Sequence, residues 1–240
     1  MKKQILFIFI LCYGTAILHA QSKVWDFPVG PGSKEWGSAK SLDERLFLYN
    51  IPTSLSATMA TEDLVITCLN YPEWRMIFTR NSIMQGYEFI KSQFNGFREL
   101  ELRKDAGRFL LAAYTKKNYD EIVQITNRVD LGRFIQSILY IEILLSQGNI
   151  INNMDKSDQE ALKDQAIKSF ESETRLMEYY GLPALEMSAL IMAKLLIMES
   201  QTNPLLTTKL DDEILLFVKN AGTRKIFVWN NVYDLAKGFF

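Results

Sequence analysis

The chain has 240 residues, of which 48% are hydrophobic and 23% charged, and its formal net charge at pH 7 is −1. This composition is typical of a globular protein and excludes a disordered chain. The near balance of acidic and basic side chains argues against nucleic acid as a partner and against electrostatic attachment to an anionic membrane.

Residues 1–20 have the pattern of a secretory signal peptide. Two lysines precede an apolar stretch from Ile5 to Leu18, and Ala20 provides the small residue before the expected cleavage site. The apolar stretch is shorter than the roughly 20 residues of a membrane span. A lipoprotein would use Cys12, but this cysteine does not follow the small residue that processing prefers. We therefore predict an exported protein, periplasmic or extracellular, with no transmembrane span after cleavage.

Cleavage removes the chain's single histidine, His19, and leaves Cys68 as the one cysteine of the mature protein. Histidine-based catalytic sites, histidine-based zinc sites and an internal disulfide are excluded in such a chain. Cys68 falls on an apolar helix face, which favours packing over reactivity. Neither a glycine-rich phosphate loop nor an EF-hand spacing occurs, so we predict no cofactor and no metal site.

Residues 21–40 are predicted to form an extended arm. Between Ser22 and Gly37 the chain carries two prolines, three glycines and three large aromatic side chains. Proline and glycine at this density disfavour a helix, and flexible linkers seldom carry two tryptophans. We therefore expect the aromatic side chains to hold the arm on the body. The next segment, 41–49, begins with the capping-box pair Ser41 and Glu44 and predicts a helix.

The stretch from Met59 to Tyr114 is dense in helix starts, helix stops and apolar faces. Its first predicted helix begins at Thr61, whose hydroxyl is expected to accept a hydrogen bond from a free amide, and ends at Asn70. A second helix runs from Asn81 or Ser82 to Phe94. Because the connections are short, the apolar faces of these helices are expected to pack on one another.

A third helix is predicted to begin near Phe97. Apolar side chains at helical spacing continue from Leu102 to Ala113, so we expect one uninterrupted helix over this range. Between the second and third helices, Asn95 or Gly96 is expected to take a positive φ in a turn.

Helical periodicity continues to the C-terminal region. The segment Leu131–Leu145 is apolar over most of its circumference and should be central. Ser157 and Glu160 have the spacing of a second capping box. The apolar segment Pro183–Glu199 is too short for a membrane span and is interrupted by charges, so we predict a buried core helix. Residues 225–229 are rich in strand-forming side chains, whereas 230–237 suit a helical turn.

These elements together predict an all-α fold. We expect seven to ten helices, arranged as antiparallel hairpins stacked in a single domain over residues 41–240, with a solenoid-like stack as one form of this arrangement. No low-complexity segment and no clear linker divides the chain.

A set of positions within 51–114 forms a recognisable pattern. These positions are Ile51, Pro52, Thr61, Leu64, Cys68, Leu69, Asn70, Tyr71, Pro72, Gly86, Phe94, Asn95, Gly96, Glu99, Leu100, Arg103, Asp105, Ala106 and Tyr114. In them the chain resembles a family of uncharacterised proteins exported by Bacteroidota. The resemblance implies an envelope or secreted location and a helical fold. It implies no activity, and no functional residue is carried over from it.

The strongest candidate for a binding patch is the set Tyr71, Trp74 and Arg75. Aromatic and arginine side chains are favoured at interfaces, and these three lie on a predicted turn. The competing interpretation is that Trp74 and the segment 76–78 cap the core between two helices.

Acidic pairs are the remaining candidates for catalysis in a chain without histidine. They fall in predicted first turns of helices, where acids favour the helix dipole without a catalytic role. Glu199 and Ser200 are similar to the Glu-Ser pair of helical peptidoglycan transglycosylases, but the Gly- and Gln-containing motif that should follow is absent. We therefore predict an exported, non-catalytic helical module that binds a protein or a glycan of the cell envelope. The alternative is a carboxylate-dependent hydrolase or lyase acting on cell-wall or other carbohydrate.

Overall fold

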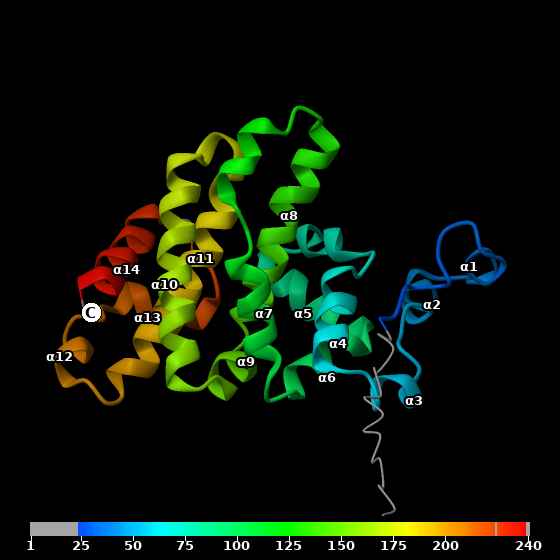
Figure 1. Ribbon diagram of the computed structural model, residues 1–240, viewed down its shortest axis with the longest axis horizontal. Coiled ribbons are helices and arrows are strands. Elements are labelled where there is room, and N and C mark those ends of the chain that lie inside the picture. Colours follow the sequence, from blue (N-terminus) through cyan, green and yellow to red (C-terminus); the bar gives the residue numbers. More distant parts are fainter. Residues whose placement is uncertain (1–23, 224, 239–240) are drawn as a thin grey trace, which may run out of the picture.

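The structure is a computed structural model that describes residues 24–223 and 225–238. Every regular element in these residues is a helix, and one hydrophobic cluster extends from Leu46 to Ala236 (Figure 1). The prediction of an all-α fold packed in one domain is therefore confirmed. The predicted signal peptide at residues 1–20, with Cys12 and His19, lies outside the described residues.

The described residues form fourteen α-helices and two short 3-10 helices. The first half of the chain contains α1 (Lys34–Ser38), α2 (Leu42–Phe47), α3 (Thr53–Ser56), α4 (Thr61–Leu69), η1 (Trp74–Thr79), α5 (Ile83–Gln93), α6 (Asn95–Leu102), α7 (Ala106–Thr115) and η2 (Tyr119–Gln124). The second half contains α8 (Arg128–Leu145), α9 (Gly148–Asn153), α10 (Lys156–Arg175), α11 (Met177–Ser200), α12 (Pro204–Thr207), α13 (Asp212–Asn220) and α14 (Ile226–Gly238). This total exceeds the expected seven to ten helices. Nine of these helices have eight or more residues, and the others are short.

Two antiparallel hairpins, α7–α8 and α10–α11, form the centre of the molecule. Contacts between α10 and α11 join Lys163 to Glu199 near one end and Glu173 to Ser188 farther along, so sequence position rises on one helix as it falls on the other. The hairpins pack on each other through α7 with α10 and through α8 with α11. Helices α12 to α14 cover one side of this centre and α1 to α6 the other (Figure 1).

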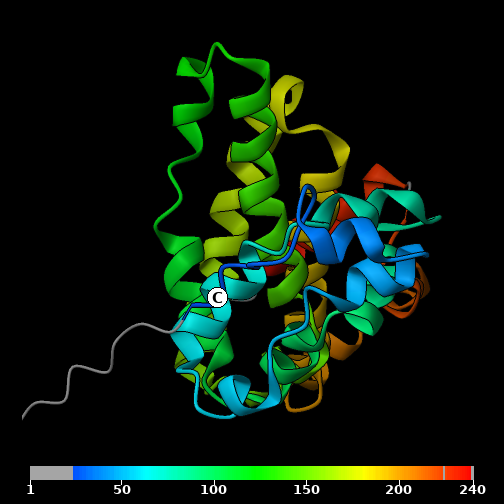
Figure 2. The same cartoon turned by 90° about the vertical axis from the view of Figure 1, so that its right-hand side faces the viewer.

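The arm before α2 is held on the body by its aromatic residues, as expected. The indole Nε1 of Trp25 donates to the carbonyl of Tyr49 at 3.0 Å, and the Trp25 amide donates to Thr67 Oγ1 at 3.0 Å. Phe27 packs its ring against Tyr49, Tyr71 and Phe94 at centroid distances of 5.7–6.1 Å. Figure 2 faces this end and shows the arm (dark blue) crossing the outside of the body.

The expectation that this arm contains no helix is wrong at its end. Residues 34–38 form α1, because Ser33 caps the segment by accepting a hydrogen bond from the Trp36 amide. The two prolines and two of the glycines lie before this cap, so they do not interrupt the turn. Ser41 accepts from the Glu44 amide at the start of α2, which confirms that predicted cap.

The predicted third helix is in fact two helices, α6 and α7, with a break at Arg103–Asp105. The Arg103 guanidinium donates to the Ser56 carbonyl at 2.9 Å, and Asp105 accepts from the Thr61 hydroxyl at 2.8 Å. Both partners are far away in sequence, so the break follows from tertiary contacts. Thr61 is a donor in this contact and does not cap α4, whose N-cap is Ala60. Leu102, expected in the apolar stripe, is 73% exposed.

The turn between α5 and α6 needs no positive φ at Asn95 or Gly96, contrary to the prediction. Asn95 starts α6 and binds the neighbouring segment with its side-chain amide, which accepts from the Ile51 amide and donates to the Ile51 carbonyl. Gly96 is required for a different reason: a Cβ there would lie 2.4 Å from the ring of Phe94.

Helix α11 is the core helix that the apolar segment 183–199 predicts. Gly181 has φ +70° and separates a first turn from the main helix, which Pro183 begins. Within the described residues, α11 is long and apolar enough to cross a membrane by length and composition, and 61% of its most apolar stretch is buried in the structure.

One prediction about the C-terminal half is wrong, and the structure decides a segment that the sequence left open. Helix α10 is capped by Asp155, which accepts from the Asp158 amide, so Ser157 lies inside the helix and forms no capping box. Residues 225–229, which have strand-forming composition, belong almost entirely to the helix α14. Val228 and Trp229 are buried there, so packing against α11 decides the conformation over intrinsic preference.

Candidate functional site

The three residues of the predicted binding patch do not share one environment. Tyr71 is 2% exposed and Trp74 is 1% exposed, whereas Arg75 next to them is exposed. Tyr71 stacks on Phe94 with ring centroids 4.7 Å apart. Of the three, Arg75 alone presents its side chain to solvent, so the set does not form a continuous surface patch.

Trp74 is the centre of the N-terminal core, as the competing interpretation expected. Its Nε1 donates to the Cys68 carbonyl at 2.7 Å, and its ring stacks on Tyr140 of α8 at 4.3 Å and 8°. Cys68 itself is fully buried, and burial raises the pKa of its thiol well above the ordinary value. The protonated, enclosed thiol is a packing group, in agreement with the sequence prediction.

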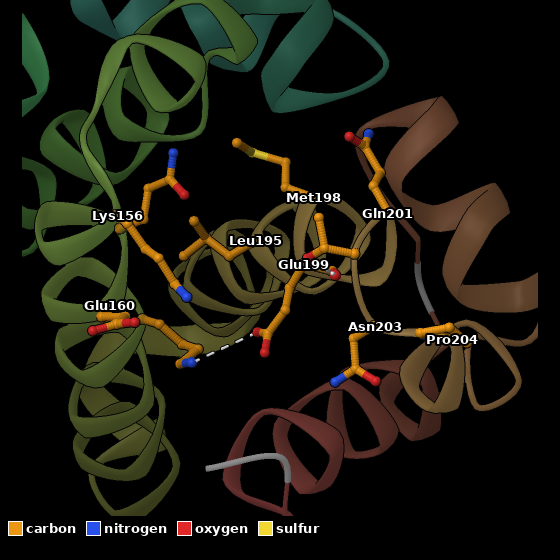
Figure 3. A pocket seen from close by; sticks show the side chains of 11 residues that line it. Lys156, Glu160, Leu195, Met198, Glu199, Gln201, Asn203 and Pro204 are labelled. Atoms are coloured by element: carbon orange, nitrogen blue, oxygen red, sulfur yellow. Dashed lines mark hydrogen bonds and ion pairs between the residues drawn. The ribbon is translucent and has the colours of Figure 1, made fainter.

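A groove of about 700 Å³ lies where the start of α10 faces the end of α11 and the turn into α12. We call it the α10–α11–α12 groove. Its lining residues are Lys156, Gln159, Glu160, Lys163, Leu195, Met198, Glu199, Gln201, Thr202, Asn203 and Pro204. In Figure 3, Lys156 points into the groove from α10, and Glu199 reaches toward α10 from the opposite wall.

Local sequence features hold these walls in place. Asp155 caps α10 directly before Lys156, and Gln159 donates to the carbonyls of Ile151 and Met154, which fixes the first turn of the wall. On the other side, Asn203 caps α12 by accepting from the Leu206 amide. The groove is thus bounded by capped helix ends that need no ligand to be ordered.

An ion pair crosses the groove. The Lys163 ammonium lies 3.9 Å from the Glu199 carboxylate, and the exposed fractions of the two side chains are 5% and 32%. Burial lowers the pKa of Lys163, while the nearby carboxylates of Glu199, Asp164 and Glu160 act in the opposite direction. The Glu199 carboxylate is therefore held by a nearly buried cation, and part of the side chain remains exposed to a ligand.

Part of this site could be predicted from the sequence. Glu199 belongs to the Glu-Ser pair and Glu160 to the expected capping box, whereas nothing in the sequence distinguishes Lys156 or Lys163. The spacing of Glu160 and Lys163 places both on one side of α10. Only the antiparallel packing of α11 shows that this side faces Glu199.

A second polar cluster is buried between the two hairpins. Glu142 of α8 and Glu173 of α10 have no exposed surface, and each acts on the pKa of the other, while Glu142 Oε2 and Glu173 Oε1 have no hydrogen-bond partner within the described residues. Tyr114 donates to Glu142 Oε1 at 2.6 Å, and Ser188 donates to Glu173 Oε2 at 2.8 Å. Desolvation raises the pKa of Glu142 well above its ordinary value and that of Glu173 to about 8. Because both side chains are enclosed, the protonation of this pair affects the stability of the fold, and neither carboxyl is open to a ligand.

The α10–α11–α12 groove therefore has the composition of a recognition surface for a polar ligand. It offers two ammonium groups, two carboxylates, three side-chain amides and one hydroxyl beside the apolar Leu195 and Met198. These groups can donate to and accept from a polar ligand without further rearrangement of the helices. No protein-family model, curated protein or solved structure matches the chain.

Proposed function

We propose that the chain is an exported, non-catalytic helical module that binds a segment of a protein partner in the cell envelope, and that the partner lies in the α10–α11–α12 groove. The observation that supports this proposal is the mixed lining of the groove. Lysine and glutamate side chains of opposite charge stand on facing walls, with amide side chains and a methionine between them.

This lining favours a protein segment over a glycan. The side-chain amide of Gln201 matches the donors and acceptors of a peptide backbone. Met198 and Leu195 provide an adaptable apolar surface for a side chain of the partner. Sugar rings usually stack on aromatic side chains, and none of the residues that line this groove is aromatic.

Photo-crosslinking in cells tests this proposal. A photoreactive phenylalanine in place of the exposed Gln201 should crosslink to one envelope protein, because this position faces the groove. The matched control carries the same residue in place of Glu35, which is exposed on α1 at the far end of the molecule. If both positions give the same crosslinked products, the groove is not the binding site.

A charge reversal gives a second readout. Lys156→Glu changes an exposed groove residue and should lower the crosslinking yield at position 201 by at least about fivefold, because one wall then repels the acidic groups of the partner. Lys168→Glu makes the same charge change on an exposed position of α10 outside the groove lining and should leave the yield unchanged. Equal yields in the two variants contradict the proposal.

One observation supports a second candidate function, a carboxylate-dependent hydrolase or lyase. Glu160 and Glu199 come from two facing helices and line the same groove, and Lys163 forms an ion pair with Glu199. A pair of carboxylates across a groove is the arrangement that glycoside cleavage requires. Release of reducing ends from purified peptidoglycan by the wild-type protein, and its loss in both Glu160→Gln and Glu199→Gln, would establish this activity. If the wild-type protein releases no reducing ends, this candidate function is excluded.

A further inference from the structure

A separate groove of about 480 Å³ lies between α4, α7 and α8. We call it the α4–α7–α8 groove. Its floor is apolar and includes Leu69, Phe109 and the buried Ile141. Ala112 and Ala113 leave this stretch of α7 without bulky side chains, which makes the surface hollow. Ile66 on its edge is 40% exposed. A concave apolar surface is therefore exposed to solvent in this groove.

One cation lies at the wall of this groove. The ammonium of Lys117 is half-buried and donates to Ser137 Oγ at 2.8 Å, and no ion pair within the described part of the chain includes it. A partly desolvated ammonium whose bonded partner is a neutral hydroxyl is stabilised further by an anion. Burial lowers its pKa, and the Glu121 carboxylate acts in the opposite direction. Lys116, also lining the groove, is exposed and adds a second positive charge.

We propose that the α4–α7–α8 groove binds a free long-chain fatty acid. The carboxylate pairs with the ammonium of Lys117, and the alkyl chain lies on the apolar floor formed by Leu69, Phe109 and Ile141. Glu62, exposed on the rim contributed by α4, disfavours a ligand with anionic groups along its whole length. A single anionic head with an apolar tail satisfies all of these features. This site is distinct from the α10–α11–α12 groove and does not depend on the function proposed for it.

Calorimetric titration of the exported protein with dodecanoate below its micelle concentration tests the site. Binding is expected to strengthen from octanoate to dodecanoate by up to about fourfold for each methylene that the groove buries. Undecyltrimethylammonium has the same alkyl chain with the opposite charge and should bind at least about tenfold more weakly. Equal binding of the two detergent-like probes, or no binding of dodecanoate, overturns the proposal.

Two variants locate the head and the tail. Lys117→Met keeps an apolar stem and should weaken dodecanoate binding at least about tenfold, whereas Lys168→Met removes an equivalent charge elsewhere on the surface and should not. Ile66→Glu changes a side chain that is already 40% exposed, so folding should persist while the added charge repels the ligand. If both Lys117→Met and Ile66→Glu bind dodecanoate as tightly as the wild type, the ligand binds elsewhere on the protein and the assignment is refuted.

Discussion

The buried pair Glu142–Glu173 makes the stability of this protein dependent on pH. In the folded chain the pKa of Glu173 is raised to about 8, mainly by desolvation, whereas its ordinary value is 4.5. Between these values the folded state keeps a proton that the unfolded state releases. Rising pH therefore favours unfolding: the stabilising contribution is complete below pH 4.5 and is lost as pH rises toward 8.

The magnitude follows from the proton balance. Where one proton is held only by the folded state, each unit of rising pH lowers the free energy of unfolding by about 1.4 kcal/mol. The loss between pH 5 and pH 7 is therefore about 3 kcal/mol. Glu142 also has a raised pKa, because of burial and of the adjacent Glu173, and it adds a change of the same sign. Glu171, whose pKa is lowered by its hydrogen bonds to Lys237 and Tyr233, is already ionised above pH 4.5 and does not contribute in this range.

Urea unfolding at pH 5, 6 and 7 measures this effect. The variant Glu173→Gln cannot ionise, yet its carbonyl can still accept from the Ser188 hydroxyl, so the pH dependence of the free energy of unfolding should become shallower by about 3 kcal/mol over the range. The double variant with Glu142→Gln should lose most of the remaining pH dependence of the free energy of unfolding. Glu178→Gln, an exposed position, is the control and should follow the wild type. A wild-type protein that is as stable at pH 7 as at pH 5 would refute the reasoning.

Two further predictions concern packing and hydrogen bonding, and both are checked by thermal and chemical unfolding. Gly86→Ala should destabilise the protein by about 1–3 kcal/mol, because the new Cβ would lie 2.0 Å from the Ile77 carbonyl oxygen, whereas Gly148→Ala meets nothing within 4 Å and should be neutral or slightly stabilising. Equal effects of the two would contradict the close contact. Asn95→Ala removes both hydrogen bonds to Ile51 and should cost about 2–3 kcal/mol, while a loss below about 0.5 kcal/mol would show that water replaces them.

Local signals in the sequence predicted most of the helices. Ser82 caps α5 by accepting from the Gln85 amide, and Asn70 ends α4. Of the apolar segment 131–145, residues 138–145 are buried in the centre of the fold as the second half of α8, whereas 131–137 are only partly buried or exposed. These features depend on residues a few positions apart, so the chain's own pattern contains them.

Two of the incorrect predictions involve contacts between distant residues. The break between α6 and α7 depends on Arg103 reaching Ser56 and on Asp105 reaching Thr61. The burial of Trp74 likewise depends on Tyr140, which comes from a helix in the second half of the chain. A local pattern of aromatic residues on a turn does not distinguish a surface patch from a core that a later helix covers.

The lining of the α10–α11–α12 groove could not be predicted from local sequence patterns. Its charged residues on α10 have the spacing of a solvent-facing helix surface, and their role follows from the register in which α11 packs antiparallel to α10. Nothing within either helix specifies that register. The buried Glu142 was visible as one of few charged residues in an apolar helix, but its partner Glu173 lies on a helix of mixed composition.

The docked arm has a consequence for handling the protein. Trp25 is bonded to a residue 42 positions later, and Phe27, with a backbone φ of +53°, covers the rings of Tyr49, Tyr71 and Phe94. The first described residues of the chain therefore close a core that later residues build. A fragment cut after Phe27 would expose these three rings as one apolar surface and would tend to aggregate. Proteolytic trimming of the N-terminus is thus a route to insoluble protein, and intact mass should be verified before any binding measurement.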